Sequence, residues 1–466
     1  MTSLSQAKGI TSGKLFPAVI RFAIPLFISS LVQALFTAAD TAVVGNFTAG
    51  DDRAVASIGA ANPVIFLLVN SFVAFSTGVG IIIARAIGAR DDEQIKKSVD
   101  TCILFSVILG VCLTLASLVS AVPILKAMDC PAECFDSAVI YMKIYMMGTP
   151  VVMLYNFAAA IIRAEGDSTR PLYYIIIAGI INVVCNILLC LLLEDKVIAV
   201  AISTVLSQTV SAVLALMRLV TKKEGPCHFS FRKFCFDWKI LGSVLRYGIP
   251  LSITSAIYPI AGLQIQPAIN SYGSANLAGC AAASNIDSMS NTLYVAFNSA
   301  SVTFMSQNIG AHNRKRVMQT FWVCGICSFF AGLIPGLLSY RYSEFLLGLF
   351  LPGNPDAVFY GQKRMQYVSA FLWVAAINGS LSSAIAAFGY PTMSTLNNLI
   401  SVLGFRIIWM NFVYNRAPSI DLLYVCYTIS WSLTCVIYII LFIYALIKYQ
   451  RKEKRREAQQ TQPEPA

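Results

Sequence analysis

The sequence predicts an all-α integral membrane protein with 12 transmembrane helices, arranged as two pseudo-symmetric six-helix bundles. Three observations predict this fold class: an apolar composition, about twelve apolar runs of spanning length, and motifs that recur at a constant offset. Hydrophobic residues make up 57% of the chain and charged residues 12%, with a mean hydropathy of +0.69. A water-soluble chain carries about a quarter charged residues, so most of this surface must face lipid.

Each apolar run is long enough to cross a hydrocarbon core about 30 Å thick, which takes about 20 helical residues. The first run is too long for a cleaved signal peptide, and further spans follow it instead of a mature soluble domain. The twelve expected spans are residues 16–45, 56–84, 98–125, 137–163, 170–193, 196–220, 241–270, 278–308, 317–340, 360–388, 392–414 and 420–448.

Motifs in the two halves of the chain repeat at nearly the same distance. The recurring pairs are Ile24-Pro25-Leu26 with Ile249-Pro250-Leu251 at 225 residues, Gly88 with Gly310 at 222, and Gly166 with Gly389 at 223. Such constancy indicates a six-plus-six duplication, which is a common plan among transporters. An even number of spans in each half makes the two repeats parallel in the membrane.

The chain is therefore expected to divide into an N-terminal lobe at residues 1–221, a basic cytoplasmic linker at 222–240 and a C-terminal lobe at 241–448. Residues 449–466 are expected to form a cytoplasmic tail, basic at first and then disordered, because Gln, Pro and Glu dominate its end. A polar linker would let the two lobes rock against each other, which is the usual basis of alternating access.

The distribution of positive charge predicts the orientation in the membrane. Alternating the spans from a cytoplasmic N-terminus places 25 of the 34 Lys and Arg residues on the inner side and 8 on the outer side, with Arg406 inside a span. The positive-inside rule then predicts a multi-pass protein of the plasma (inner) membrane with both termini cytoplasmic. The net charge of +11 is accounted for by the lipid bilayer as partner, and no nucleic acid is needed.

Residues that could hold a metal or perform catalysis are scarce. The 13 cysteines are odd in number and scattered through apolar runs, so neither a disulfide framework nor a metal site is expected. The two histidines, His228 and His312, fall in predicted cytoplasmic loops, and no phosphate loop or nucleophile elbow occurs. The sequence therefore predicts neither an enzyme nor an ATP-driven pump, and no cofactor.

Few ionisable groups remain inside the spans, where each costs at least about 2.5–3.5 kcal/mol to insert. Of the acids, Asp40 and, less deeply, Asp287 lie within spans. Asp40 lies on one helix face with Ser29, Gln33, Phe36 and Thr37. A carboxyl group facing the bundle interior could exchange a proton or bind Na⁺. The alternative is an aspartate at the membrane interface that is merely solvated.

Amide side chains could complete a polar site around Asp40. Asn182 and Asn186 lie one turn apart in the fifth span, and Asn156 lies in the fourth. Because amides both donate and accept hydrogen bonds, these residues could frame a small polar site with Asp40. The alternative is that they join helices through interhelical hydrogen bonds.

The second half of the chain differs chemically from the first. Asp287 is expected near the start of the eighth span, where capping of the helix N-terminus competes with a functional role. The region that corresponds to Asp40 contains Gln264 and no acid. Arg406 is the one cation expected deep in a span, and it could pair with a loop acid, reach the interface or stack on an aromatic ring.

Several of these segments resemble the multidrug and toxic compound extrusion (MATE) family, over nearly the whole chain. The segments are residues 163–171 (Arg-Ala-Glu-Gly-Asp-Ser-Thr-Arg-Pro), the most specific, with Pro25, Asp40 and Val44-Gly45, residues 86–89, Gly389-Tyr390-Pro391, and residues 404–409. One branch of the family uses acids in the seventh and tenth helices, where this chain has Gln264, Gln266 and Asn378. The chain is therefore more similar to the DinF-like branch.

The resemblance implies a V-shaped pair of lobes that exports cationic and amphipathic compounds in exchange for H⁺ or Na⁺. Matched position by position, it implies a coupling site at Asp40, Asn156, Asn182, Asn186 and Thr204. It also implies that a kink at Pro25 responds to the charge on Asp40. Relatives often carry an acid where Asn186 stands, so the resemblance favours H⁺ slightly over Na⁺.

The leading functional hypothesis is an ion-coupled antiporter for small amphipathic molecules, expected to be monomeric. The residues expected to line its cavity are Gln33, Phe36, Tyr155, Gln264, Asp287 and Asn378. One alternative is a flippase for lipid-linked oligosaccharides, which would be expected to line its cavity with several Arg or Lys, whereas Arg406 stands nearly alone within the spans. The other is a membrane-embedded enzyme, for which the catalytic motifs are lacking.

Overall fold

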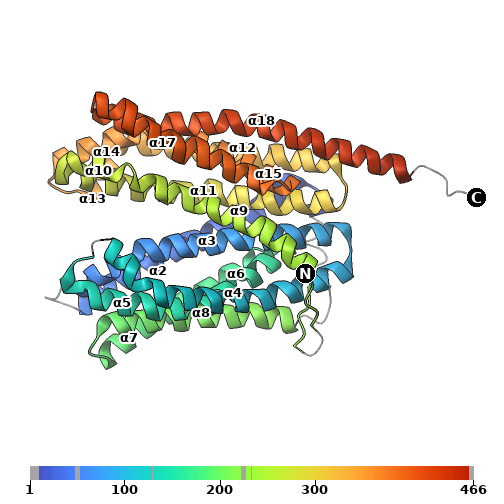
Figure 1. Cartoon of the computed structure of the whole chain (residues 1–466), viewed down its shortest axis with the longest axis horizontal. Helices are drawn as coiled ribbons and strands as arrows, with labels where there is room; N and C mark the ends of the chain where they lie inside the picture. Colours follow the sequence, from blue (N-terminus) through green and yellow to red (C-terminus); the bar gives the residue numbers. More distant parts are fainter. Residues whose placement is uncertain (1–9, 48–52, 129, 222–226, 232–233, 461–466) are drawn as a thin grey trace, which may run out of the picture. The chain divides into compact units, whose positions relative to one another are not determined.

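The computed structural model describes residues 10–47, 53–128, 130–221, 227–231 and 234–460, and in these residues it is helical without strands. The chain forms two compact units. Unit 1 is Ile24–Gly248, and unit 2 is the described part of Lys8–Ala23 and Ile249–Ala466. Figure 1 shows that long helices run side by side within each unit.

Unit 1 contains six membrane-length segments. They are α2 (Leu15–Phe47) from Ile24 onward, α3 (Arg53–Ala89), α4 (Asp92–Ala127), the pair α5 (Ala132–Met147) and α6 (Thr149–Ala164), α7 (Thr169–Leu192) and α8 (Lys196–Thr221). The pair α5 and α6 is bent by 44°. Pro150 in the first turn of α6 has no amide hydrogen to continue the helical ladder, which explains why the fourth expected span is broken here.

Unit 2 repeats this plan with more interruptions. Its unbroken segments are α11 (Gly273–Gly310), α12 (Arg314–Arg341) and α18 (Ile420–Gln460). Two segments are pairs of helices: α9 (Trp238–Leu263) with α10 (Gln266–Ser271), and α14 (Pro355–Tyr367) with α15 (Leu372–Phe388). The remaining segment is mixed and consists of α16 (Pro391–Asn398), η2 (Leu399–Gly404), α17 (Phe405–Ile408), η3 (Trp409–Val413) and η4 (Tyr414–Arg416). The short helix α13 (Ser343–Phe350) and η1 (Ser369–Phe371) connect them.

The described residues contain ten helices that are long and apolar enough to cross a membrane, or eleven when α5 and α6 count as one. Helix α11 has 38 residues but is rich in Ser, Asn and Gly, which lowers its hydropathy. About half of its polar side chains are buried, including Asn276, Asp287 and Asn298. With α11 included, all twelve expected spans coincide with helical segments.

The motif at residues 163–171 connects two of these spans. Gly166 has a φ of +96°, a left-handed conformation that glycine adopts without strain, and it ends α6. The carboxylate of Asp167 then accepts hydrogen bonds from the backbone N–H groups of Thr169 and Arg170 at 3.1 Å each and caps α7. In the second half Gly389, with a φ of +105°, ends α15 in the same way.

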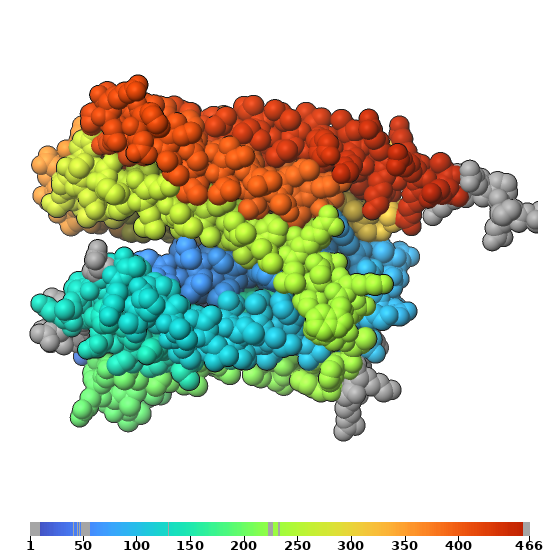
Figure 2. Space-filling model, viewed as in Figure 1, coloured from blue at the N-terminus to red at the C-terminus, as the bar shows by residue number. Residues whose placement is uncertain are grey.

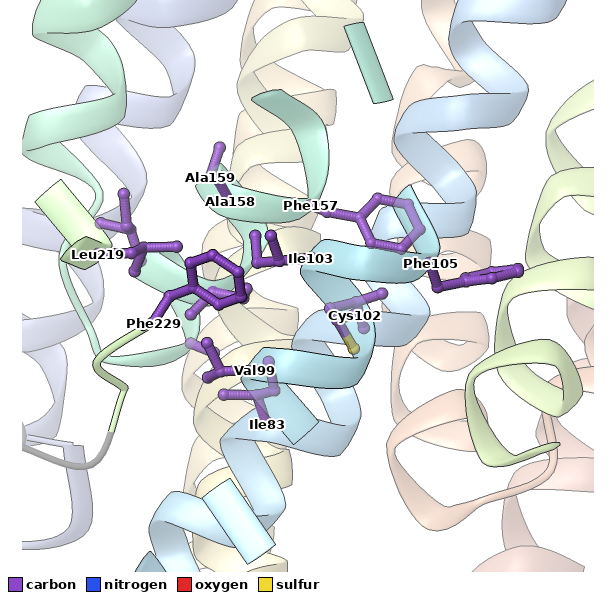
Figure 3. Packing of buried hydrophobic residues seen from close by; sticks show 14 of the residues in the cluster. Ile83, Val99, Cys102, Ile103, Phe105, Phe157, Ala158, Ala159, Leu219 and Phe229 are labelled. Atoms are coloured by element: carbon purple, nitrogen blue, oxygen red, sulfur yellow. The ribbon is translucent and has the colours of Figure 1, made fainter. Parts of the chain in front are cut away.

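The core of unit 1 extends into the segment that was expected to be a linker. Three phenylalanine rings pack together in this core. The ring centroids of Phe75, Phe105 and Phe157 lie 5.9–6.3 Å apart. Phe229 packs beside Leu219 in the same cluster, as Figure 3 shows, and its exposed fraction is 2%. Within the expected linker, burial of the Phe229 ring holds the described residues 227–231 against unit 1.

The chain passes between the two units at both repeated prolines. Helix α2 belongs to unit 2 up to Ala23 and to unit 1 from Ile24, and α9 belongs to unit 1 up to Gly248 and to unit 2 from Ile249. Pro25 and Pro250 directly follow these points. Because proline removes a helical hydrogen bond, a helix can change its packing partners there without a break in the chain.

Side chains hold the exchanged segments in place. In unit 2 the Phe22 ring lies edge-on to Phe304 at 5.4 Å, and Arg316 donates from Nε to the Ile10 carbonyl at 2.7 Å. In unit 1 the Tyr247 hydroxyl accepts a hydrogen bond from Arg85 at 2.6 Å.

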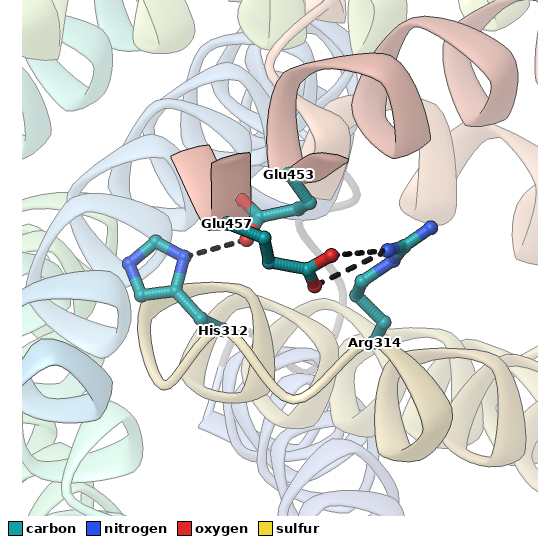
Figure 4. Close-up of polar contacts among 4 residues, drawn as sticks. All are labelled: His312, Arg314, Glu453 and Glu457. Carbon is teal, nitrogen blue, oxygen red and sulfur yellow. Dashed lines mark hydrogen bonds and ion pairs between the residues drawn. The ribbon is translucent and has the colours of Figure 1, made fainter. Parts of the chain in front are cut away.

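Helix α18 continues to Gln460, so the tail expected from residue 449 begins as helix. Figure 2 shows α18 along the edge of unit 2. Glu453 is buried and lies 2.9 Å from Nδ1 of His312, and Glu457 pairs with Arg314 at 3.2 Å (Figure 4). These pairs attach the helix extension to the turn between α11 and α12. Residues 461–466, also part of the expected tail, lie outside the described residues.

Candidate functional site

Asp40 on α2 is bonded to α7, and through α7 to α8, within unit 1. Nδ2 of Asn186 on α7 donates to Oδ1 of Asp40 at 2.5 Å, and the same Nδ2 lies 3.3 Å from Oδ1 of Asn182. The hydroxyl of Ser203 on α8 donates to Oδ1 of Asn186. Asn182 and Asn186 reach the same point because a step of four residues returns to one helix face. The Asn186 amide therefore has a partner for both its nitrogen and its oxygen.

The described residues that contact Asp40 carry no charge. Tyr141 and Tyr145 on α5 lie close enough to interact with the Asp40 carboxylate electrostatically. Among the described residues no Lys, Arg or His pairs with Asp40. A carboxylate held by amides instead of by a fixed cation can change its own charge without leaving an unpaired partner behind.

Two expected coupling residues do not bond to Asp40. Nδ2 of Asn156 donates to the Val152 carbonyl at 2.8 Å, and Oγ1 of Thr204 donates to the Val200 carbonyl at 2.9 Å, both within their own helices. The residue that sequence reasoning missed is Ser203. A pattern in the sequence does indicate it, because Ser203, Ser207 and Ser211 are spaced by four residues and therefore lie on one face of α8, which is buried.

The residues expected to line a cavity in unit 1 have different environments. Phe36 is partly buried and its ring covers Gly179 of α7, where an added Cβ would overlap the ring. Gln33 is exposed on α2. Tyr155 is buried in the core of unit 1 and its hydroxyl lies 3.4 Å from the Pro171 carbonyl. Tyr155 is therefore a packing residue in this structure.

Pro25 lies ten residues into α2, and its carbonyl accepts a hydrogen bond from the Ser29 hydroxyl at 2.7 Å. A bond of this kind within a proline-containing turn commonly accompanies local bending. The position suits a hinge, because α2 belongs to unit 2 up to Ala23 and to unit 1 from Ile24, the residue before Pro25.

Asp287 does not cap a helix, because α11 begins at Gly273 and the carboxylate lies well inside it. Nη1 of Arg364 on α14 donates to Oδ2 of Asp287 at 2.5 Å, and the Ser369 hydroxyl donates to Oδ1 of Asp287 at 2.5 Å. All three side chains are buried. The N-cap expectation is therefore wrong, since the eighth span starts earlier than its apolar run.

Three further polar side chains singled out in unit 2 have different environments. Nδ2 of Asn378 donates to the Trp431 carbonyl at 2.9 Å. The guanidinium of Arg406 lies 4.2 Å from the centre of the Tyr427 ring, so aromatic stacking is the alternative that the structure supports. Gln264 lies at the break between α9 and α10 and borders a pocket.

Comparison with known proteins identifies the family. The family model MatE matches the chain twice, at residues 25–188 and 250–411. The chain belongs to the MatE family. Both matches begin at one of the two repeated prolines, which confirms the internal duplication.

MATE proteins are multidrug efflux transporters of the membrane and not enzymes, and they handle small molecules. The chain is 26% identical to the probable multidrug resistance protein YoeA of Bacillus subtilis (strain 168), over 92% of this chain and 97% of that protein. It is 24% identical to the probable multidrug resistance protein NorM of Thermotoga maritima (strain ATCC 43589 / DSM 3109 / JCM 10099 / NBRC 100826 / MSB8), over 82% of each chain.

Solved structures show the same fold. A structure described as MATE in the bent conformation matches with a TM-score of 0.85 at 21% identity, over 98% of this chain and 99% of that one. An outward-facing MATE transporter matches with a TM-score of 0.82 at 19% identity, over 96% and 98%. The MATE fold has twelve transmembrane helices, in agreement with the segments described above.

Proposed function

We propose that the protein is a secondary antiporter that exports amphipathic or cationic compounds in exchange for H⁺, with Na⁺ as the alternative ion, and that Asp40 is its coupling residue. The observation that carries the proposal is the set of neutral partners around Asp40 in the interior of unit 1. In the ionised state the carboxylate accepts a charge-assisted hydrogen bond from Asn186. Protonation weakens this bond and removes the charge.

The orientation of the Asn186 amide favours the proton over Na⁺. Asn186 presents its N–H to Asp40, while its oxygen already accepts from Ser203. A bound Na⁺ would need oxygen atoms on several sides, and an N–H directed at the same carboxylate opposes it. A proton needs only a free lone pair on Asp40.

We also propose that the protein lies in the plasma membrane with both termini in the cytoplasm. The excess of Lys and Arg in the loops on one side supports cytoplasmic termini in the plasma membrane. The protein would act as a monomer, with substrate and ion alternating in occupancy.

Reconstitution into liposomes tests this function. A pH gradient and a Na⁺ gradient are imposed separately while the movement of a fluorescent organic cation is followed. We expect the pH gradient to drive export and Asp40→Asn to abolish that dependence. Equal transport with neither gradient, or an Asp40→Asn variant that matches the parent, would contradict the proposal.

A further inference from the structure

Unit 2 contains an open pocket of about 400 Å³ where three of its helices meet. The end of α12 contributes Tyr340 and Arg341, the start of α13 contributes Ser343, and α14 forms the opposite wall. Figure 1 shows α13 and α14 at the end of unit 2 opposite to the C-terminus. The volume falls within the range of small-ligand sites.

The wall formed by α14 is a single polar face of that helix. It begins with Phe359, which is 52% exposed. Gln362, Lys363 and Gln366 follow by three, four and seven residues, so their side chains lie on the same side of the helix. The two amide groups can each donate and accept hydrogen bonds.

The pocket carries a positive charge. Arg341 is exposed, and its guanidinium lies 5.8 Å from the centre of the Tyr342 ring, with no acid as ion-pair partner among the described residues. Nζ of Lys363 lies 3.1 Å from Oδ1 of Asp421, so its charge is partly compensated. No Asp or Glu of the described chain lines the pocket. An anion in the pocket would therefore be attracted, mainly by Arg341.

The pocket lies at the level where lipid headgroups are expected. The ninth expected span ends at residue 340 and the tenth begins at residue 360, on the same side of the membrane, and the lining residues lie at these two boundaries. Tyr340 is 41% exposed, as is common for tyrosine at the membrane interface. Basic pockets between transmembrane helices bind acidic lipid headgroups.

An exposed apolar stripe on α12 leads directly to the pocket. Ile334, Leu337 and Leu338 are 45–53% exposed. Arg341 follows them by seven, four and three residues, so it lies at the end of the same helix face. A soluble phosphate ester would use the pocket alone, whereas a phospholipid would use the pocket and the stripe together. The continuity of the two surfaces favours the lipid.

We propose that this pocket binds the phosphodiester headgroup of an anionic phospholipid, held mainly by Arg341 and secondarily by Lys363, with an acyl chain along the α12 stripe. With the cytoplasmic termini proposed above, the lipid belongs to the outer leaflet. Binding needs neither an ion gradient nor an exported compound, so this site does not depend on the proposed transport.

The test uses two lipid probes that differ in the headgroup, phosphatidylglycerol and phosphatidylcholine, each with a photoreactive diazirine at the same acyl carbon near the glycerol. A trace of either probe is added to the full-length protein in phosphatidylcholine nanodiscs, which are then irradiated. Mass spectrometry of the digested protein quantifies the label on residues 334–343 and 359–366, and labelled peptides elsewhere give the internal reference. Each Lys or Arg near a membrane surface favours an anionic lipid about fivefold, so the parent should carry about five- to twentyfold more phosphatidylglycerol than phosphatidylcholine here.

Four variants locate this preference. Arg341→Gln should reduce it about fivefold, whereas Arg341→Lys, which keeps the charge, should retain most of it. Lys363→Gln should have a smaller effect, because Asp421 already offsets that charge. Arg416→Gln is the matched control: Arg416 is an exposed cation shortly before α18, at the same end of unit 2, and does not line the pocket. That variant should label like the parent.

Three results would overturn the proposal. They are equal labelling of the parent by both probes, an equal loss in Arg416→Gln and Arg341→Gln, and competition by glycerophosphoglycerol. This compound is the same headgroup without acyl chains, and its competition at modest excess would identify a soluble anion as the ligand. A failure of both ion gradients to drive export would contradict the antiport proposal and leave this labelling pattern unchanged.

Discussion

Asn186 connects the fifth span of unit 1 to the first by donating Nδ2 to Oδ1 of Asp40 at 2.5 Å. Because the donor is an amide, the strength of this bond depends on the charge of the carboxylate. Any event that neutralises Asp40 therefore weakens the contact between α2 and α7.

Asp40→Asn should reduce gradient-driven export by about tenfold or more, since a hydrogen bond to a charged group is worth about 1.5–3 kcal/mol and the exchangeable proton is also lost. Transport into liposomes of known protein content measures this. Asp421→Asn is the control, because that acid is half exposed and pairs with Lys363 at 3.1 Å in a bridge of the kind that contributes little. Equal losses in the two variants would argue against a special role for Asp40.

Gly179→Ala should destabilise the protein by about 1–3 kcal/mol, because the new methyl group would overlap the Phe36 ring. Combining it with Phe36→Ala should remove the overlap and recover part of the loss. Thermal unfolding in detergent measures both. Gly262→Ala, with no atom within 4 Å of its added Cβ, is the matched helical control and should cost nothing. If the two single substitutions behave alike, Phe36 does not pack on Gly179.

Asp287→Leu should cost about 3–5 kcal/mol, because it leaves the buried Arg364 guanidinium without its carboxylate. The double variant Asp287→Leu with Arg364→Met should be more stable than the single one, since both charges are then gone. The midpoint temperature of thermal unfolding ranks the stabilities of the parent, the single variant and the double variant. A double variant less stable than Asp287→Leu would show that Arg364 has another essential partner.

Trypsin should cleave slowly after the basic residues at 451, 452 and 454–456 of the parent, because Glu453 attaches this part of α18 to His312. Glu453→Ala should speed cleavage several-fold by favouring local opening of the helix end. Glu457→Ala should have a smaller effect, since 62% of that side chain is exposed. Mass spectrometry of the fragments over time measures the rates, and rapid cleavage of the parent would mean that the extension does not stay docked.

The sequence predicts the fold well because each span must carry enough apolar residues to cross lipid, and this requirement leaves a local signal. It also singles out Asp40, Asn182 and Asn186, since charged and amide groups are costly in a membrane and stand out against apolar neighbours. Proximity in space was harder to predict. Ser203 joins the site and Thr204 does not, although the two are adjacent in the sequence.

The errors in unit 2 have a common physical cause. Asp287 and Arg364 neutralise each other, so α11 can begin before its apolar run and bury the Asp287 carboxylate where the sequence predicted a helix start. Phe229 was missed because one aromatic residue in a basic segment carries no periodic signal, yet its burial fixes the segment.

The exchange of helix ends at Pro25 and Pro250 means that neither half of the gene encodes a self-sufficient fold. A polypeptide that starts at Trp238, where α9 begins, would lack Lys8–Ala23 of unit 2, and one that ends before Trp238 would lack residues 238–248 of unit 1. Two such fragments would have to be present together and exchange the starts of their first helices before either unit could be complete. A single-repeat ancestor would be complete in the same way as a homodimer in which the two chains swap these helix segments. Duplication and fusion of its gene would then join the two copies in one chain.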